Sequence, residues 1–100
     1  MADWIISNKK QSYAEKRQWD FDFNPDLISG VTVSSATGTH VPPGGSTVTG
    51  TVTVGSAVAG VVPVMLQLAA LQLGTHYLKC LATLSNTEKS ELVVVFQVDF

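Results

Sequence analysis

Hydrophobic and polar residues alternate along most of the chain with the period of two that is typical of β-strands. The pattern is clearest at residues 19–23, Trp-Asp-Phe-Asp-Phe, which places three aromatic side chains on one face and two aspartates on the other. Residues 47–54 alternate valine with threonine or glycine, and residues 61–68 place valine or leucine at every second position. Further strands are predicted at 28–39, 77–83 and 91–100.

Turn-forming residues separate these segments. Asn24-Pro25-Asp26 ends the first aromatic strand, prolines and glycines mark a loop at 41–46, and small residues predict a turn at 55–60. A polar loop at 85–90 joins the last two strands. Short strands joined by turns predict an all-β chain folded as a sandwich of two sheets.

The segment Leu71-Gln-Leu-Gly-Thr-His-Tyr77 predicts the corner that leads into one of these strands. Gly74 permits a tight backbone, and the Tyr77 ring is expected to fold under the turn, where its phenol can bond an upstream backbone group. This is the tyrosine corner of immunoglobulin-like folds. We therefore predict an immunoglobulin-like β-sandwich of about seven antiparallel strands, with a core that contains Trp19, Phe21, Phe23, Tyr77 and Val95.

The apolar run at residues 57–73 raises two alternatives to a strand. Leu, Gln, Ala and Met favour a helix, and Pro63 could occupy the first turn of one over 63–73. A membrane-spanning helix is not expected, because Gly60, Pro63 and Gln67 interrupt a run that barely reaches the roughly 20 residues required. The order of charged and apolar residues at the N-terminus does not match a signal peptide.

A chain of 100 residues is long enough for one domain. Four of its six basic residues lie within 1–18, which we predict to be an N-terminal arm or an edge segment ahead of a sandwich domain at 19–100. The net charge of −2 gives no basic field for nucleic acid. The single cysteine, Cys80, excludes a disulfide within the chain.

No Asp, Glu, Lys or Arg occurs between Leu27 and Leu78. Monomeric proteins commonly place charge, above all lysine, on exposed sheet edges to prevent edge-to-edge pairing. The uncharged stretch is therefore either a neutral, threonine-rich surface or a surface that is buried against other subunits. On the second interpretation Thr49 and Thr51 contact the neighbouring subunit. The N-terminal arm would contact it as well: Trp4, Ile5 and Ile6 would supply apolar contacts, and Lys9 and Lys10 would attract the partner electrostatically.

No set of residues predicts a reaction. Residues 20–24 have the spacing that begins a calcium loop, but Pro25 stands where that loop needs glycine. His40 and His76 lack a cysteine or carboxylate at metal-ligand spacing, and we predict that they are surface or loop residues. On a strand, His76 and Cys80 share a face but lie too far apart to bond, so Cys80 is predicted to be an inert core thiol. We therefore expect a protein that is not an enzyme and has no cofactor or metal.

Four segments together resemble a family of small immunoglobulin-like virion proteins of tailed bacteriophages and prophages, of the fibre–tail adaptor or head–tail component type. They are the aromatic strand 19–23, Ser-Gly-Val-Thr-Val-Ser-Ser-Ala-Thr at 29–37, the Ser/Thr/Gly-rich centre at 46–54, and Gly-Thr-His-Tyr at 74–77 with the strand that follows. The corner also resembles that of fibronectin type III domains, with Leu73 in place of proline. The loop at 86–89 lacks the glycine of the phage family's tight hairpin.

The resemblance implies a non-enzymatic structural subunit of the virion, in the neck, tail or capsid, that is assembled in the host cytoplasm. Its partners would be other virion subunits, in multiple copies of a symmetric assembly, with neither nucleic acid nor a membrane. The alternative is an immunoglobulin-like module that binds host surface carbohydrate through stacking aromatics, for which Trp4, Tyr13 and Trp19 are the candidates. Alternation places Trp19 in the core, which removes the best of the three.

Overall fold

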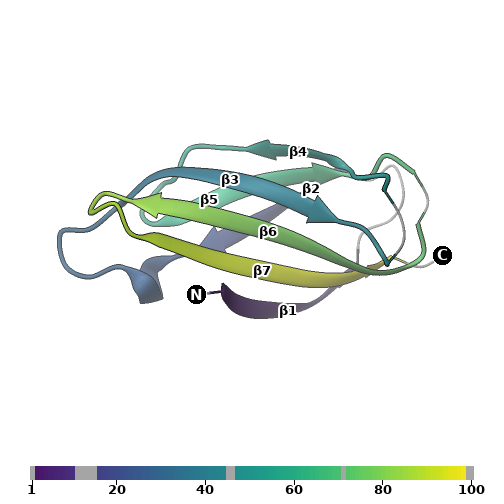
Figure 1. The fold of residues 1–100 in the computed structure, drawn as a ribbon, viewed down its shortest axis with the longest axis horizontal. Helices are drawn as coiled ribbons and strands as arrows, with labels where there is room; N and C mark the ends of the chain where they lie inside the picture. Colours follow the sequence, from purple (N-terminus) through teal and green to yellow (C-terminus); the bar gives the residue numbers. More distant parts are fainter. Residues whose placement is uncertain (1, 11–15, 45–46, 71, 99–100) are drawn as a thin grey trace.

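The computed structural model describes residues 2–10, 16–44, 47–70 and 72–98, and for residues 2–10 and Asp26 it describes the backbone alone. Within these residues the strands form two sheets packed face to face (Figure 1). The four-stranded sheet has the order β1-β7-β6-β3, and the three-stranded sheet has the order β2-β5-β4. The prediction of an all-β sandwich is confirmed. The strands are β1 (Ala2–Lys10), β2 (Lys16–Asp22), β3 (Val33–Val41), β4 (Thr51–Val54), β5 (Val61–Gln67), β6 (Gly74–Leu84) and β7 (Lys89–Val98), and a single 3₁₀ turn, η1 (Asn24–Asp26), follows β2.

The prediction that all strands are antiparallel is wrong for β1. This strand runs parallel to β7, with Trp4 opposite Val93 and Ile6 opposite Val95. The next strand along the chain, β2, belongs to the other sheet, so no hairpin forces β1 to run antiparallel to its neighbour. Strand β2 begins at Lys16, ahead of the predicted domain boundary at residue 19.

Period-two alternation identifies the core residues correctly at residues 19–23 and on β5. Trp19, Phe21 and Phe23 are all buried, and Asp20 and Asp22 between them are exposed. On β5 every second residue is buried, as predicted, so the alternative of a helix over 63–73 is wrong there. No helix in the described part of the chain is long and apolar enough to cross a membrane. The inward residues of β5 and the segment after it are Val62, Val64, Leu66 and Leu68.

Pro63 lies in the central strand of the three-stranded sheet, a position that proline usually avoids because it has no N–H to donate. The Pro63 carbonyl accepts a hydrogen bond from the Gly55 amide at 2.8 Å. The side of β5 that lacks the N–H therefore faces Gly55, which lies just beyond the end of β4 at Val54. The proline thus removes no donor opposite a residue of β4.

The prediction of a tyrosine corner with Tyr77 in the core is wrong, because His76 and not Tyr77 faces the core. His76 is fully buried between the sheets, whereas Tyr77 and its cross-strand partner Val95 are half-buried on the outer face of the four-stranded sheet. Successive residues of a strand point to opposite faces, so a displacement of one residue exchanges the two. Cys80 faces the core, and Tyr77 precedes it by an odd number of residues, so Tyr77 points to the opposite face. Phe96, next to Val95, takes the core position on β7.

The hairpin between β6 and β7 replaces glycine with side-chain hydrogen bonds. Thr87 adopts a φ of 70°, in the left-handed region that glycine usually occupies. The Asn86 side chain accepts a hydrogen bond from the Glu88 amide at 3.1 Å and donates one to the Glu88 carboxylate at 2.7 Å. These bonds hold a tight turn without a glycine.

Candidate functional site

Two open strand edges lie side by side along one side of the sandwich: β3, at the edge of the four-stranded sheet, and β4, at the edge of the three-stranded sheet (Figure 1). A Cβ placed on Gly38 of β3 would lie 2.8 Å from a methyl of Val52 and 3.0 Å from a methyl of Val54, so the two strands approach closely. We call this pair of strands the β3/β4 edge.

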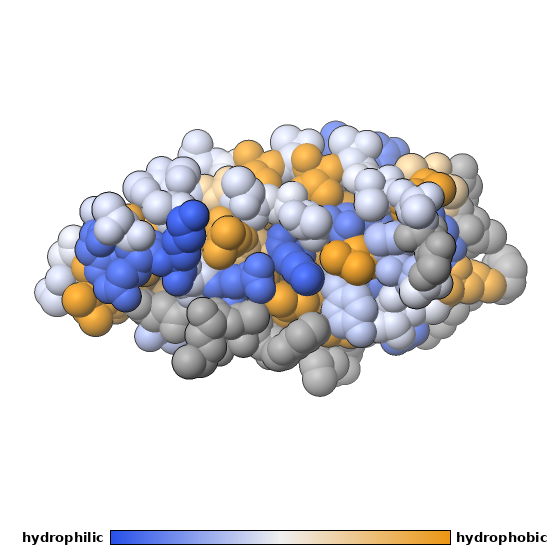
Figure 2. All heavy atoms as spheres, viewed as in Figure 1, coloured by the Kyte–Doolittle hydropathy of each residue, from blue (hydrophilic) through white to orange (hydrophobic). Residues whose placement is uncertain are grey.

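The β3/β4 edge contains no charged residue. The opposite edge strands, β1 and β2, contain aspartate, lysine and arginine. In Figure 2 the strongly hydrophilic residues gather over β6 and β7, while the upper part of the view, over β3 and β4, is mostly pale and orange. The molecule therefore has charge on one pair of strand edges and none on the other.

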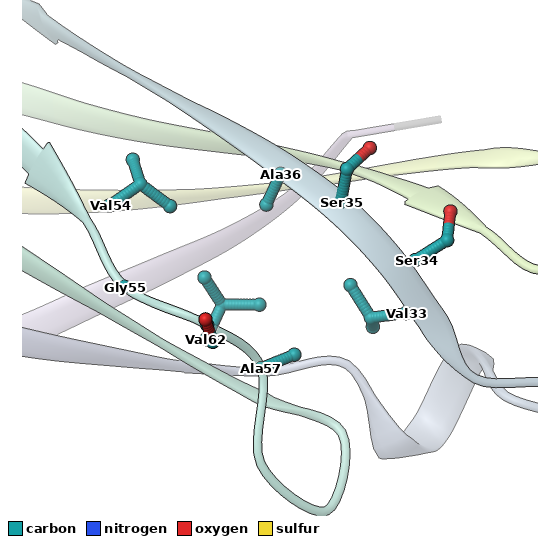
Figure 3. Close-up of a pocket in the computed structure, with 9 residues that line it drawn as sticks. Val33, Ser34, Ser35, Ala36, Val54, Gly55, Ala57 and Val62 are labelled. Carbon is teal, nitrogen blue, oxygen red and sulfur yellow. The ribbon is translucent and has the colours of Figure 1, made fainter.

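A cleft of about 320 Å³ opens between the two strands of the β3/β4 edge (Figure 3). Val33 and Ala36 point from β3 toward Val54 and Val62 on the other side. The register of β3 shifts between Val33 and Ser35, and this bulge leaves two successive serines exposed at the rim. No lining residue is titratable, so the cleft is suited to uncharged side chains and not to acid–base chemistry. The other lining residues are Ser34, Ser35, Gly55, Ser56 and Ala57.

Strand β4 has backbone groups that are directed outward. Gly55 and Pro63 form a hydrogen-bonded pair, and such pairs alternate with non-bonded pairs along an antiparallel ladder. The alternation turns the N–H and C=O groups of Thr51 and Thr53 toward β5, and those of Val52 and Val54 away from it. Another strand can therefore pair with the open side of β4.

The residues predicted as contacts fall on opposite sides of the sandwich. Thr49 and Thr51 are exposed at the start of β4. Trp4, Ile5, Ile6, Lys9 and Lys10 all lie in β1, at the edge of the four-stranded sheet, and only their backbone is described. For residues 2–10 the structure matches an edge segment of the same sandwich. Deletion of residues 1–12 would uncover β7, so such a deletion does not test partner contacts alone.

A second feature, which the sequence did not predict, lies at the end of the sandwich where β3 stops and β6 starts. His40 and His76 are buried, with only 4% and 0% of their surface exposed, so the prediction that they are surface or loop residues is wrong. His40 Nε2 and His76 Nδ1 lie 2.8 Å apart, and the two rings stack with centroids 5.1 Å apart. The stack continues through Phe96 to Trp19, at 5.3 and 5.2 Å. We call His40 and His76 the histidine pair.

The hydrogen bonds of the histidine pair have one consistent direction. The Gly50 amide can only donate, so His40 Nδ1, at 2.7 Å, is an acceptor, and the hydrogen of a neutral His40 lies on Nε2. The Gln72 carbonyl can only accept, so His76 Nε2, at 2.7 Å, carries a hydrogen, and its Nδ1 is free to accept from His40. Two neutral rings thus satisfy all four ring nitrogens.

This arrangement makes His40 a poor base and the histidine pair a poor metal ligand. Burial lowers the pKa of His40 to about 4, and the neighbouring His76 ring adds to the shift. All ring nitrogens are already bonded, and no group of three or more His, Cys, Asp or Glu among the described residues could hold a metal ion. Cys80 is fully buried, and burial raises the pKa of its thiol to about 11. The prediction of a core thiol at Cys80 is confirmed.

Comparison of the chain with protein-family models, with curated proteins and with solved structures gave no match. The geometry defines two candidate sites: the β3/β4 edge, which contains Thr51, and the histidine pair.

Proposed function

We propose that this protein is a non-enzymatic structural subunit of a tailed-phage particle, and that it acts in repeated copies through contacts at the β3/β4 edge. The observation that carries the proposal is the pair of adjacent, uncharged strand edges over a cleft lined by apolar and hydroxyl side chains. Such an edge is a ready template for pairing with another chain. The phage context comes from the resemblance of segments such as 19–23 and 74–77 to that family.

The strand order supports an immunoglobulin-like assignment. Immunoglobulin constant-type sandwiches place the second, fifth and fourth strands in one sheet, and the third, sixth and seventh in the other. In this chain β2-β5-β4 and β7-β6-β3 have those orders. The parallel pairing of β1 with β7 extends the second sheet.

Charge favours a second copy of the chain as the occupant of the β3/β4 edge. When two identical edges pair about a two-fold axis, residues near the axis lie close to their own copies, so a charge placed there meets a like charge. Strand β4 contains no charged residue, so two copies of it meet no like charges in any register. Strand β2, which has two cations and two aspartates, avoids like-charge contacts only in some registers. A face of threonine, serine and valine also loses little hydration free energy on burial, compared with a charged face.

The alternative of carbohydrate binding has less support. Stacking on a sugar requires an exposed aromatic face, and Trp19 is 5% exposed and packs on Phe96. The side chain of Trp4 and all of Tyr13 lie outside the described residues. Assembly therefore remains the function that we propose.

Thr51→Lys tests the proposal because it places one charge on the β3/β4 edge at an exposed position. Gln18→Lys is its matched control: Gln18 is exposed on the other edge strand of the same sheet, and it lies in line with Met65 and Thr53. We expect both variants to fold, and Thr51→Lys to enter particles on the order of tenfold less than Gln18→Lys, because like charges would oppose each other across the contact. Subunit content is measured by quantitative mass spectrometry of purified particles. Equal incorporation of the two variants would contradict the proposed contact.

A further inference from the structure

The histidine pair ties together two chain connections at its end of the sandwich. His40 accepts from Gly50 in the β3–β4 connection, and His76 donates to the Gln72 carbonyl in the β5–β6 connection. The Gln72 side chain in turn donates to the Val48 carbonyl at 2.8 Å, which joins one connection to the other. A closed circuit of short hydrogen bonds therefore links strands β3 and β6 to the two connections.

We propose that the histidine pair is an acid-sensitive latch: as two neutral rings it holds the β3–β4 and β5–β6 connections against the sandwich, and protonation of either ring releases them. The latch is a property of the single chain and does not depend on the assembly role.

Protonation of either ring turns a hydrogen bond into a repulsion. A proton added to His40 Nδ1 would point at the Gly50 N–H. A proton added to His76 Nδ1 would point at the hydrogen on His40 Nε2. In both states two donors face each other, and a cation lies among buried aromatic rings with no counter-charge among the described residues.

The described residues around the latch offer no anion to stabilise a protonated ring. Among the described residues the core-facing side chains of β3, β4, β5 and β7 near the pair are uncharged. On β6, Cys80 faces the core, and its raised pKa keeps the thiol neutral. On β2, the half-buried Arg17 shares the inner face with Trp19, and a cation there opposes a second cation. Tyr77 and Lys79 lie on the outer face of β6, away from the pair.

The sign of the pH effect follows from the lowered pKa of His40. The folded ring binds a proton less readily than the unfolded one, so the latch contributes its full stability above about pH 6.5 and loses it as the pH falls toward about 4. This shift corresponds to an opening constant on the order of a hundredfold larger at pH 4 than at pH 7.

Opening of the latch would also act on the β3/β4 edge. Gly50 directly precedes Thr51, the first residue of β4. Gly50 packs so tightly on β5 that a Cβ there would lie 2.7 Å from the Gln67 carbonyl oxygen. Release of Gly50 from His40 therefore frees the start of the strand that we propose as a contact, and acid would weaken that contact.

Nuclear magnetic resonance on the intact chain tests the latch. The chain has two histidines, so every imidazole signal belongs to the pair. At pH 7 we expect both rings as the neutral tautomer with hydrogen on Nε2. A ring with hydrogen on Nδ1, or a cationic ring at pH 7, would overturn the latch.

Hydrogen exchange provides the second measurement, with the Gly55 amide as the internal control, because it bonds to Pro63 at the far end of β4. Between pH 7 and pH 4 the protection factor of the Gly50 amide is expected to fall on the order of a hundredfold relative to that of Gly55. Protection factors that fall together would mean that the whole domain opens, and unchanged factors would mean that the pair does not respond to acid. Either result would refute a local acid-sensitive latch.

Discussion

Phe21→Ala is expected to reduce the free energy of unfolding by about 3–5 kcal/mol, which is most of the stability of a small domain. Phe21 is completely buried near the C-terminal end of β2, opposite Val62 of β5, and belongs to the core cluster between the sheets. Alanine would leave a cavity that two packed sheets can fill only in part. Chemical denaturation of the purified domain measures the loss.

Asp20→Ala is the control for this prediction, because Asp20 is the preceding residue of β2 and points to the opposite, exposed face. Its side chain accepts a hydrogen bond from Gln18, which is also exposed, so its removal is expected to change stability by no more than about 0.5 kcal/mol. A Phe21→Ala domain that melts cooperatively at the midpoint of the unchanged chain would refute the assignment of the core.

His76→Ala is the second change with a large expected effect. It removes a ring that stacks between His40 and Phe96, and it leaves His40 Nε2 and the Gln72 carbonyl without their partner. A buried donor left unsatisfied costs roughly 1–3 kcal/mol, and the lost packing adds to this cost. Chemical denaturation at pH 7 measures the total loss of stability.

A double-mutant cycle with His40→Ala separates the bond between the rings from the packing of each ring. Residues that share one hydrogen-bond network show coupling of about 0.5–3 kcal/mol. We therefore expect the double variant to lose less stability than the sum of the two single variants. Additive losses would mean that the two rings stabilise the fold independently.

Strongly alternating segments made much of the fold predictable from sequence. The aromatic strand containing Phe21 and the strand that became β5 both contain long period-two patterns, which fix the buried face without any knowledge of the partner strand. The Leu, Gln, Ala and Met residues of 63–73 favoured a helix that Pro63 could begin, and tertiary structure decided against it. The missing N–H of Pro63 faces Gly55, past the end of β4, so a central strand could contain proline.

The corner was mispredicted because a Gly-Thr-x-Tyr motif does not by itself fix which face of the strand the tyrosine occupies. Cys80 was predicted to lie in the core, and His76 was placed on the same face as Cys80, so the two inferences together already implied that His76 is buried. The choice of Tyr77 as the core residue conflicts with this alternation. The partner of His76 could not be foreseen in this way, because His40 is 36 residues away and meets it only through the pairing of β3 with β6.

The uncharged stretch was visible in the sequence, but its meaning depends on strand order. Only the structure shows that β3 and β4 are the edge strands of their sheets, and that they lie on the same side of the sandwich. The place of residues 2–10 was likewise beyond sequence reasoning, because parallel pairing with β7 joins the two ends of the chain.

Cross-linking within purified particles tests most directly whether copies of this chain meet at the β3/β4 edge. Cys80 is buried, so a cysteine introduced by Thr51→Cys is the reactive thiol, and Gln18→Cys provides a matched thiol on the opposite edge of the same sheet. A short bifunctional thiol reagent is expected to join Thr51→Cys subunits to one another as covalent dimers and to leave Gln18→Cys subunits uncoupled. Dimers from Gln18→Cys alone, or from neither variant, would contradict assembly through this edge.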